Sequence, residues 1–177
     1  EFELPEIKDD EILVKVMSDS ICMSTYKLVK QGKKHKRAPQ NIDTNPIIVG
    51  HEFAGDIVQV GKKWQDQFKP GQKFSIQPAI NYQGKLDSPG YSYEFCGGAA
   101  TYCIIPHEVM EMGCLLSYDV ESYFQASLGE PMSCIIGGYH ANYHTNKKNY
   151  EHAMGTKTDG NILIMGGCGP MGLGAVS

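Results

Sequence analysis

The amino-acid sequence predicts a mixed β and α/β protein: a β-rich body, then helices, then the opening of a nucleotide-binding unit. Three observations predict this order. Short strands separated by regular turn signals continue to about Pro106. Helical spacing follows over residues 119–145, and an apolar segment with a glycine-rich loop occupies residues 158–176. With 177 residues, 41% hydrophobic and 20% charged, the chain can form one packed domain and the start of another.

The β-rich part begins with residues 11–18, where Ile12, Val14 and Val16 alternate with other side chains and predict a half-buried strand. A helix is predicted over residues 20–32, with Gly32 as its stop signal. Further strands are predicted over residues 47–61, as two pieces joined at His51-Glu52, and over 73–77 and 97–106. Residues 80–95 are rich in glycine and tyrosine and predict an irregular excursion.

Composition excludes several classes of function. The net charge of −4 gives no electrostatic basis for nucleic-acid binding, because the one basic run, residues 30–37, is too short. The longest apolar stretch, residues 162–176, contains several glycines and a proline, so no membrane span is expected. Six cysteines without a paired motif indicate reduced thiols and a cytoplasmic protein. The absence of an initiator Met and the end at Ser177 suggest a fragment, or the visible part of a longer chain.

The glycine-rich loop predicts a dinucleotide site. Gly167, Gly169 and Gly172 form a G-x-G-x-x-G pattern directly after an apolar segment predicted as a strand, and Pro170 and Met171 lie within it. Its glycines permit a tight turn and a close approach of the backbone to a pyrophosphate. The residue that would separate NAD from NADP lies about twenty positions further on, beyond this chain.

Candidate metal ligands lie at breaks between regular elements. Cys22, His51 and Glu130 are residue types that bind zinc. Taken singly, each has a simpler interpretation: a buried thiol, a turn histidine and a carboxylate at a helix start. Their spacing matches no compact zinc-finger pattern, so the residues alone leave both interpretations open.

Four motifs in order carry a family resemblance. The sequence GHEFAGDIVQVG, residues 50–61, resembles the signature of the zinc-dependent medium-chain dehydrogenases, the alcohol and polyol dehydrogenase superfamily. The motifs SICMST before it, GEPMSC after the β-rich part, and GGCGPMG at the glycine loop agree in order. The resemblance implies a GroES-like, partly open β-barrel catalytic domain over residues 1–120. Connecting helices over 121–158 and a truncated Rossmann domain over 159–177 would follow.

The resemblance also implies roles for individual residues. Cys22, His51 and Glu130 would bind one catalytic zinc, and Glu52 would lie beside the metal or exchange as a ligand. Ser24 matches the hydroxyl that passes on the substrate's proton. Lys27 stands where the family often has a relay histidine, which leaves the proton path open. The four-cysteine lobe that holds a second zinc in many members is absent from this sequence.

The implied reaction interconverts a secondary alcohol and a ketone. A zinc Lewis acid would act on the substrate oxygen, and hydride would pass to or from NAD(H) or NADP(H). Two segments resemble the L-sorbose 1-phosphate reductases, so the expected substrate is a polyol, ketose or sugar phosphate. Five basic residues could help to hold a phosphate, although a solvated loop is the simpler interpretation of each: Lys30, Lys33, Lys34, Lys36 and Arg37.

The sequence leaves two alternatives to this enzyme open. One is a zinc-free quinone or enoyl reductase of the same fold, and the other is a non-catalytic barrel-fold binding protein. The family resemblance further implies a homodimer or homotetramer at full length. Neither a nucleic-acid nor a membrane partner is expected.

Overall fold

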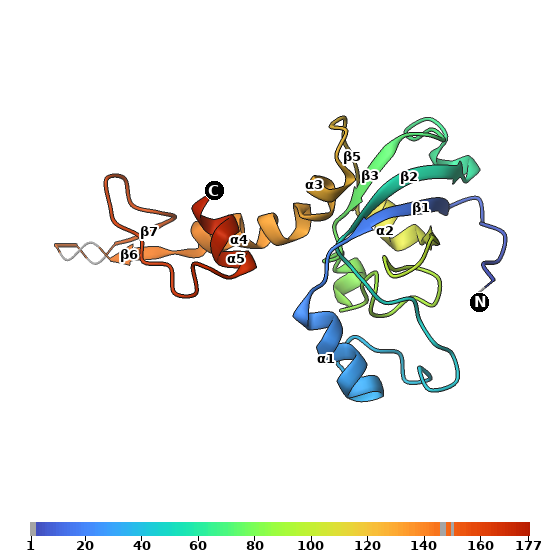
Figure 1. The fold of residues 1–177 in the computed structure, drawn as a ribbon, viewed down its shortest axis with the longest axis horizontal. Coiled ribbons are helices and arrows are strands. Elements are labelled where there is room, and N and C mark those ends of the chain that lie inside the picture. Colours follow the sequence, from blue (N-terminus) through green and yellow to red (C-terminus); the bar gives the residue numbers. More distant parts are fainter. Residues whose placement is uncertain (1–2, 146–147, 150) are drawn as a thin grey trace. The chain divides into compact units, whose positions relative to one another are not determined.

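The computed structural model describes residues 3–145, 148–149 and 151–177. The chain forms two compact units, Glu1–Gly129 and Glu130–Ser177 (Figure 1). The first unit holds the sheet and the candidate site. The second holds two helices and a short hairpin, and each unit is described by itself below.

A five-stranded antiparallel sheet in the order β4-β1-β2-β3-β5 forms the body of the first unit (Figure 1). Its strands are β1 (Ile12–Asp19), β2 (Phe53–Val60), β3 (Lys73–Ile76), β4 (Tyr102–Ile105) and β5 (Leu115–Ser117). The longest pairing joins β1 and β2, from Ile12 opposite Val60 to Asp19 opposite Phe53. Two register shifts interrupt this pairing, one between Leu13 and Val14 and one between Val16 and Ser18.

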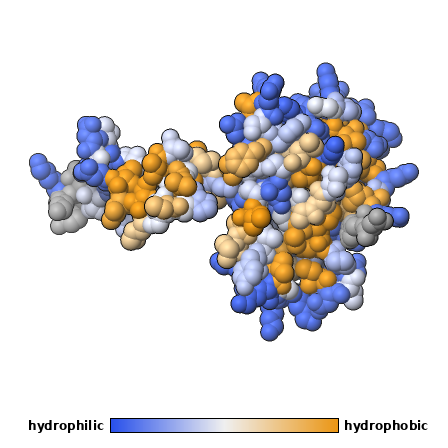
Figure 2. All heavy atoms as spheres, in the orientation of Figure 1, coloured by the Kyte–Doolittle hydropathy of each residue, from blue (hydrophilic) through white to orange (hydrophobic). Residues whose placement is uncertain are grey.

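The core of the first unit lies against this sheet. Ile12 and Val14 are fully buried, as their alternation predicts, and Phe53 meets Phe74 edge to face with ring centroids 5.9 Å apart. Figure 2 shows hydrophilic side chains around the rim of the first unit and hydrophobic ones between them on the face in view. The buried side chains fix the register of β1 and β2, because a shift of one residue would expose them.

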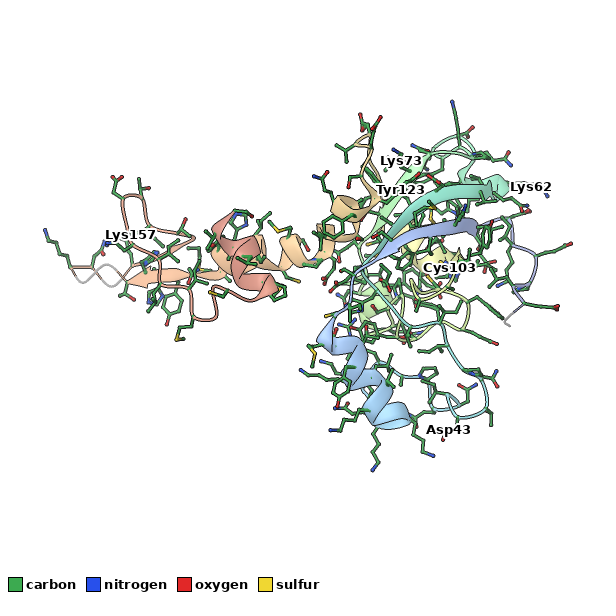
Figure 3. The ribbon with its side chains drawn as sticks, in the orientation of Figure 1. Asp43, Lys62, Lys73, Cys103, Tyr123 and Lys157 are labelled. Carbon is green, nitrogen blue, oxygen red and sulfur yellow. The ribbon has the colours of Figure 1, made fainter. Side chains whose placement is uncertain are left out.

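Three helices complete the first unit. Helix α1 (Met23–Gln31) follows β1 and ends at Gly32, whose φ of 51° is the left-handed conformation that glycine adopts readily. Helix α2 (His107–Glu111) follows β4, and α3 (Tyr123–Ser127) lies against the sheet. Tyr123 donates a hydrogen bond to Asp56 of β2 at 2.8 Å, and Lys73 lies over its ring at 5.2 Å (Figure 3). These contacts fix α3 to β2 and β3.

The second unit contains α4 (Gly129–Ala141), the hairpin β6 (Tyr143–Thr145) and β7 (His152–Met154), and α5 (Pro170–Val176). Gly174 allows α5 to approach α4, since a side chain there would meet the end of Ile135 at 2.7 Å. The Tyr139 hydroxyl donates to the carbonyl of Ala175 and holds the same two helices together.

Most elements agree with the sequence predictions, and the differences have physical reasons. Residues 161–164 form no strand in this structure, although one was predicted, because a strand needs a partner to pair with. The piece over residues 47–50 likewise forms no strand of the sheet, and its backbone instead forms hydrogen bonds with Glu94, Gly98 and Ala99. Helix α3 packs against the sheet within the first unit. The predicted domain bounds, with connecting helices over residues 121–158, stay a prediction. Among the described residues, no helix is both long and apolar enough to cross a membrane.

Candidate metal centre

Three potential metal ligands converge where β1 ends and β2 begins. Cys22 is the N-cap residue of α1, three residues after β1, and His51 and Glu52 directly precede β2. Because the strands are antiparallel and Asp19 pairs with Phe53, these two chain segments must lie side by side. One ligand atom from each of Cys22, His51 and Glu52 lies within 4.8 Å of the others.

The turn before β2 depends on glycine. Gly50 has a φ of 91°, and its carbonyl accepts a hydrogen bond from the Gly98 amide at 2.9 Å. The Glu52 carbonyl accepts from the Ser20 amide at 3.0 Å, and the Glu52 amide donates to the Asp19 carboxylate at 3.3 Å. The backbone that carries the His-Glu pair is therefore fixed from both sides.

His51 is buried and surrounded by hydroxyl groups. The Thr25 hydroxyl lies 3.3 Å from its Nδ1, and the hydroxyls of Ser24 and Tyr91 lie 3.3 Å and 3.2 Å from its Nε2. Burial lowers the pKa of His51, the Glu52 carboxylate opposes this effect, and the positive charge of Arg37 adds to it. These surroundings favour the neutral imidazole, which is the form that binds a metal.

Glu52 is buried to the same degree as His51, and Ser20 holds its side chain. The Ser20 hydroxyl donates to one carboxylate oxygen of Glu52, while the other lies 3.6 Å from His51 Nε2. Burial also raises the pKa of the neighbouring Asp19 to about 6, against the lowering effect of the hydrogen bond from the Glu52 amide. The two carboxylates are thus inequivalent: Glu52 faces the other ligands, and Asp19 supports the turn.

The donor set fits a zinc ion. Thiolate, imidazole and carboxylate are the three ligand types that zinc accepts in proteins. Ligand atoms around one tetrahedral zinc lie about 3.5 Å apart, and the ligand atoms of Cys22, His51 and Glu52, all within 4.8 Å of one another, are close to that spacing. The position of Cys22 at the N-terminus of α1 also favours a negatively charged ligand there.

The other predicted site residues divide into two groups. The Ser24 hydroxyl lies 2.9 Å from Cys22 Sγ, beside the candidate ligands, and Lys27 is exposed on the next turn of α1. Glu130 is the first residue of the second unit, where its carboxylate accepts from Cys134 Sγ at 3.4 Å. Its role as a zinc ligand therefore stays a prediction.

Sequence reasoning missed Tyr91 and Ser20. Tyr91 comes from the segment that reads as an irregular excursion, and its hydroxyl donates to Ser24 Oγ at 2.7 Å. No local pattern marks a tyrosine that reaches the site across 67 positions of sequence. Ser20 lies within the SICMST motif but carried no predicted role.

The glycine loop adopts a compact turn in the second unit. Gly169 is the N-cap residue of α5, and its amide donates to the Gly166 carbonyl at 2.9 Å. Gly172 is buried against Gly167, so that a side chain there would meet the Gly167 backbone at 2.5 Å. The third glycine of the pattern thus permits the close approach of helix and loop.

Comparison with known proteins supports the class that the fold defines, a GroES-like catalytic domain. The family model described as the alcohol dehydrogenase GroES-like domain matches residues 8–113. The chain therefore belongs to this alcohol dehydrogenase family, as the four motifs predicted.

Individual relatives are similar over nearly the whole chain. The L-sorbose 1-phosphate reductase of Klebsiella pneumoniae is 49% identical over 175 residues, which is 99% of this chain and 43% of that protein. The mannitol-1-phosphate 5-dehydrogenase of Aliivibrio fischeri is 54% identical over 175 residues, 99% of this chain and 41% of that protein. This chain thus spans less than half the length of these relatives.

Solved structures show the same fold. The 2R,3R-butanediol dehydrogenase of Bacillus subtilis superposes with a TM-score of 0.63 at 23% identity, over 82% of this chain and 44% of that one. The galactitol-1-phosphate dehydrogenase of Escherichia coli gives a TM-score of 0.59 at 24% identity, over 79% of this chain and 40% of that one. The expected GroES-like fold is confirmed.

Proposed function

We propose that this chain forms the catalytic part of a zinc-dependent NAD(P)-linked dehydrogenase that interconverts a secondary alcohol and a ketone. The observation that carries the proposal is the convergence of Cys22, His51 and Glu52 within 4.8 Å, with the Ser24 hydroxyl beside them. The expected substrate is a sugar phosphate or related polyol. The names of the two similar relatives, which act on phosphorylated sugars or polyols, support this choice.

Cys22, His51 and Glu52 would hold the metal, with Glu130 as a further ligand. Zinc in this site would supply Lewis acidity toward the substrate oxygen. His51 is suited to its part because burial keeps it neutral, and Thr25 fixes the ring through Nδ1.

Ser24 moves the substrate's proton. In the oxidising direction its hydroxyl receives the proton of the substrate hydroxyl and releases its own toward solvent. Lys27 is exposed on the next turn of α1, and we infer that it assists the transfer of this proton to solvent. Tyr91 orients Ser24 by donating to its oxygen at 2.7 Å, so the Ser24 lone pairs keep a fixed direction.

The glycine loop would bind the cofactor. Gly167, Gly169 and Gly172, with Pro170 and Met171, form a compact turn that lets the backbone approach the pyrophosphate of NAD(H) or NADP(H). When bound, the cofactor would supply the hydride chemistry. We expect a cytoplasmic enzyme that assembles as a homodimer or homotetramer at its full natural length.

Elemental analysis of the purified protein, beside a Cys22→Ser variant, tests this function. We expect about one zinc per chain in the wild type, as in catalytic sites of this ligand chemistry, and none retained in the variant. At full natural length, the zinc-loaded protein should reduce phosphorylated ketoses with NADH or NADPH. A protein without metal that reduces quinones or enoyl compounds would favour the zinc-free alternative. A protein with neither metal nor turnover would favour a binding protein.

A further inference from the structure

One cation of the basic run differs from its neighbours in its surroundings. The side chains of Lys34 and Lys36 are exposed, and Lys33 pairs with Asp43 at 3.0 Å. Arg37 is half-buried, and its guanidinium lies 5.4 Å from the centre of the Tyr91 ring. No carboxylate pairs with Arg37 in the part of the chain that the structure describes.

Tyr91 links this arginine to the candidate metal centre. Its hydroxyl contacts Ser24 and His51, and its ring centroid lies 4.7 Å from that of His51. A single aromatic ring therefore separates the guanidinium of Arg37 from the imidazole of a candidate ligand. The ring of His35 stacks on Tyr91 at 5.6 Å and 13°, which further restricts the position of Tyr91.

Arg37 also lines a small pocket of about 70 Å³. Its polar lining comprises Arg37, Asn81, Lys85 and the exposed carboxylate of Asp87. Two cations and an amide group thus surround the space, and they outnumber the one acid. The planar guanidinium fork of an arginine can form two parallel hydrogen bonds to a phosphate, and the Tyr91 ring beside it limits the positions that Arg37 can take.

We propose that this pocket is the phosphate subsite of the substrate, with Arg37 as the residue that selects phosphorylated over unphosphorylated sugars. Lys85 and Asn81 provide further donors, and Tyr91 sets the distance between the phosphate and the metal centre. In a sugar phosphate only a few bonds separate the phosphorus from a reacting carbon, so one molecule can reach both places. This proposal rests on the proposed function and narrows the role of the basic run to one side chain.

Steady-state kinetics of the Arg37→Gln variant, at full natural length, test this subsite. The control is Lys36→Gln, which removes one positive charge from the neighbouring residue. Removing a charge-assisted pair worth about 1.5–3 kcal/mol predicts a rise in KM of roughly tenfold to a hundredfold for a ketose phosphate. KM for the same ketose without phosphate should not change, and Lys36→Gln should match the wild type. An equal effect of Arg37→Gln on both substrates, or equal effects of the two variants, would overturn the proposal.

A binding measurement separates this proposal from the dehydrogenase function. Inorganic phosphate is titrated into zinc-free protein and followed by NMR. Saturable shifts of the Arg37 and Lys85 signals are expected in the wild type and in Lys36→Gln, and the Lys85 shift should be lost in Arg37→Gln. Phosphate binding of this kind, together with no turnover by the zinc-loaded protein at full natural length, would refute the dehydrogenase function and still support the anion site. Turnover of ketose phosphates without phosphate binding at Arg37 would refute the subsite alone.

Discussion

The hydroxyl of Tyr91 donates a hydrogen bond to Ser24 Oγ at 2.7 Å. The oxygen of the Tyr91 hydroxyl also lies 3.2 Å from His51 Nε2. The hydroxyl of this tyrosine therefore contacts Ser24 and His51 of the candidate metal centre, whereas Arg37 lies beside its ring. A substitution that removes only the hydroxyl can separate these two roles.

Tyr91→Phe should lower kcat with little change in KM for a phosphorylated substrate. The phenyl ring still supports Arg37, but Ser24 loses the donor that orients it. A net hydrogen-bond contribution of about 0.5–1.5 kcal/mol predicts a loss in kcat of roughly threefold to tenfold. Steady-state kinetics at saturating cofactor measure both constants. A variant whose KM rises while kcat stays constant would show that the hydroxyl acts in substrate binding instead.

Ser20→Ala should weaken zinc binding. Ser20 donates to the carboxylate of Glu52 and so holds one candidate ligand toward the other two. Loss of a partner that orients a ligand typically costs about tenfold to a hundredfold in metal affinity. Competition with a chromophoric chelator measures that affinity. Ser18→Ala is the control, because the Ser18 hydroxyl forms its hydrogen bond with the Ser127 hydroxyl at 2.8 Å. Equal losses of zinc affinity in both variants would contradict the role of Ser20.

The sequence was informative where chemistry is local. Alternating side chains predicted β1, Gly32 predicted the end of α1, and the motifs marked Cys22 and His51. It was uninformative where contacts are long-range: Tyr91 reaches Ser24 because the loop before β4 folds back toward α1, and no periodicity encodes that path. The short elements α2 and β5 were not predicted, because three to five residues are too few to show a periodic pattern of hydrophobic side chains.

Thiol reactivity should report occupancy of the metal site. Cys22 is partly exposed, so an alkylating reagent should modify it in zinc-free protein and fail to do so once zinc is bound. Cys96 and Cys103 are buried in the core (Cys103 is labelled in Figure 3), and burial raises the pKa of Cys96 well above its usual value. Both should stay unmodified in the native protein at neutral pH. Exposed Cys134 should react with or without zinc.

Mass spectrometry of the digested protein reads each site separately. Equal modification of Cys22 with and without zinc would contradict its assignment as a ligand. Fast modification of Cys96 in the native protein would show that the core opens on the time scale of the experiment.

Gly50→Ala should destabilise the protein more than Gly71→Ala, although both glycines have positive φ, 91° and 83°. A left-handed conformation costs an alanine about 1–2 kcal/mol at either position. At Gly71 the new methyl group meets nothing within 4 Å, whereas at Gly50 it would lie 2.9 Å from the Ala99 amide nitrogen and would contact Asp19. Overpacking of this kind adds about 1–3 kcal/mol at Gly50 alone. Urea unfolding of the zinc-free variants measures both losses in the free energy of unfolding.

Since Gly50 directly precedes His51, the Gly50→Ala variant should also bind zinc more weakly, while Gly71→Ala keeps the wild-type affinity. Equal destabilisation by the two substitutions would mean that the turn at Gly50 relaxes freely, and that the tight packing around it does not hold the His-Glu pair in place.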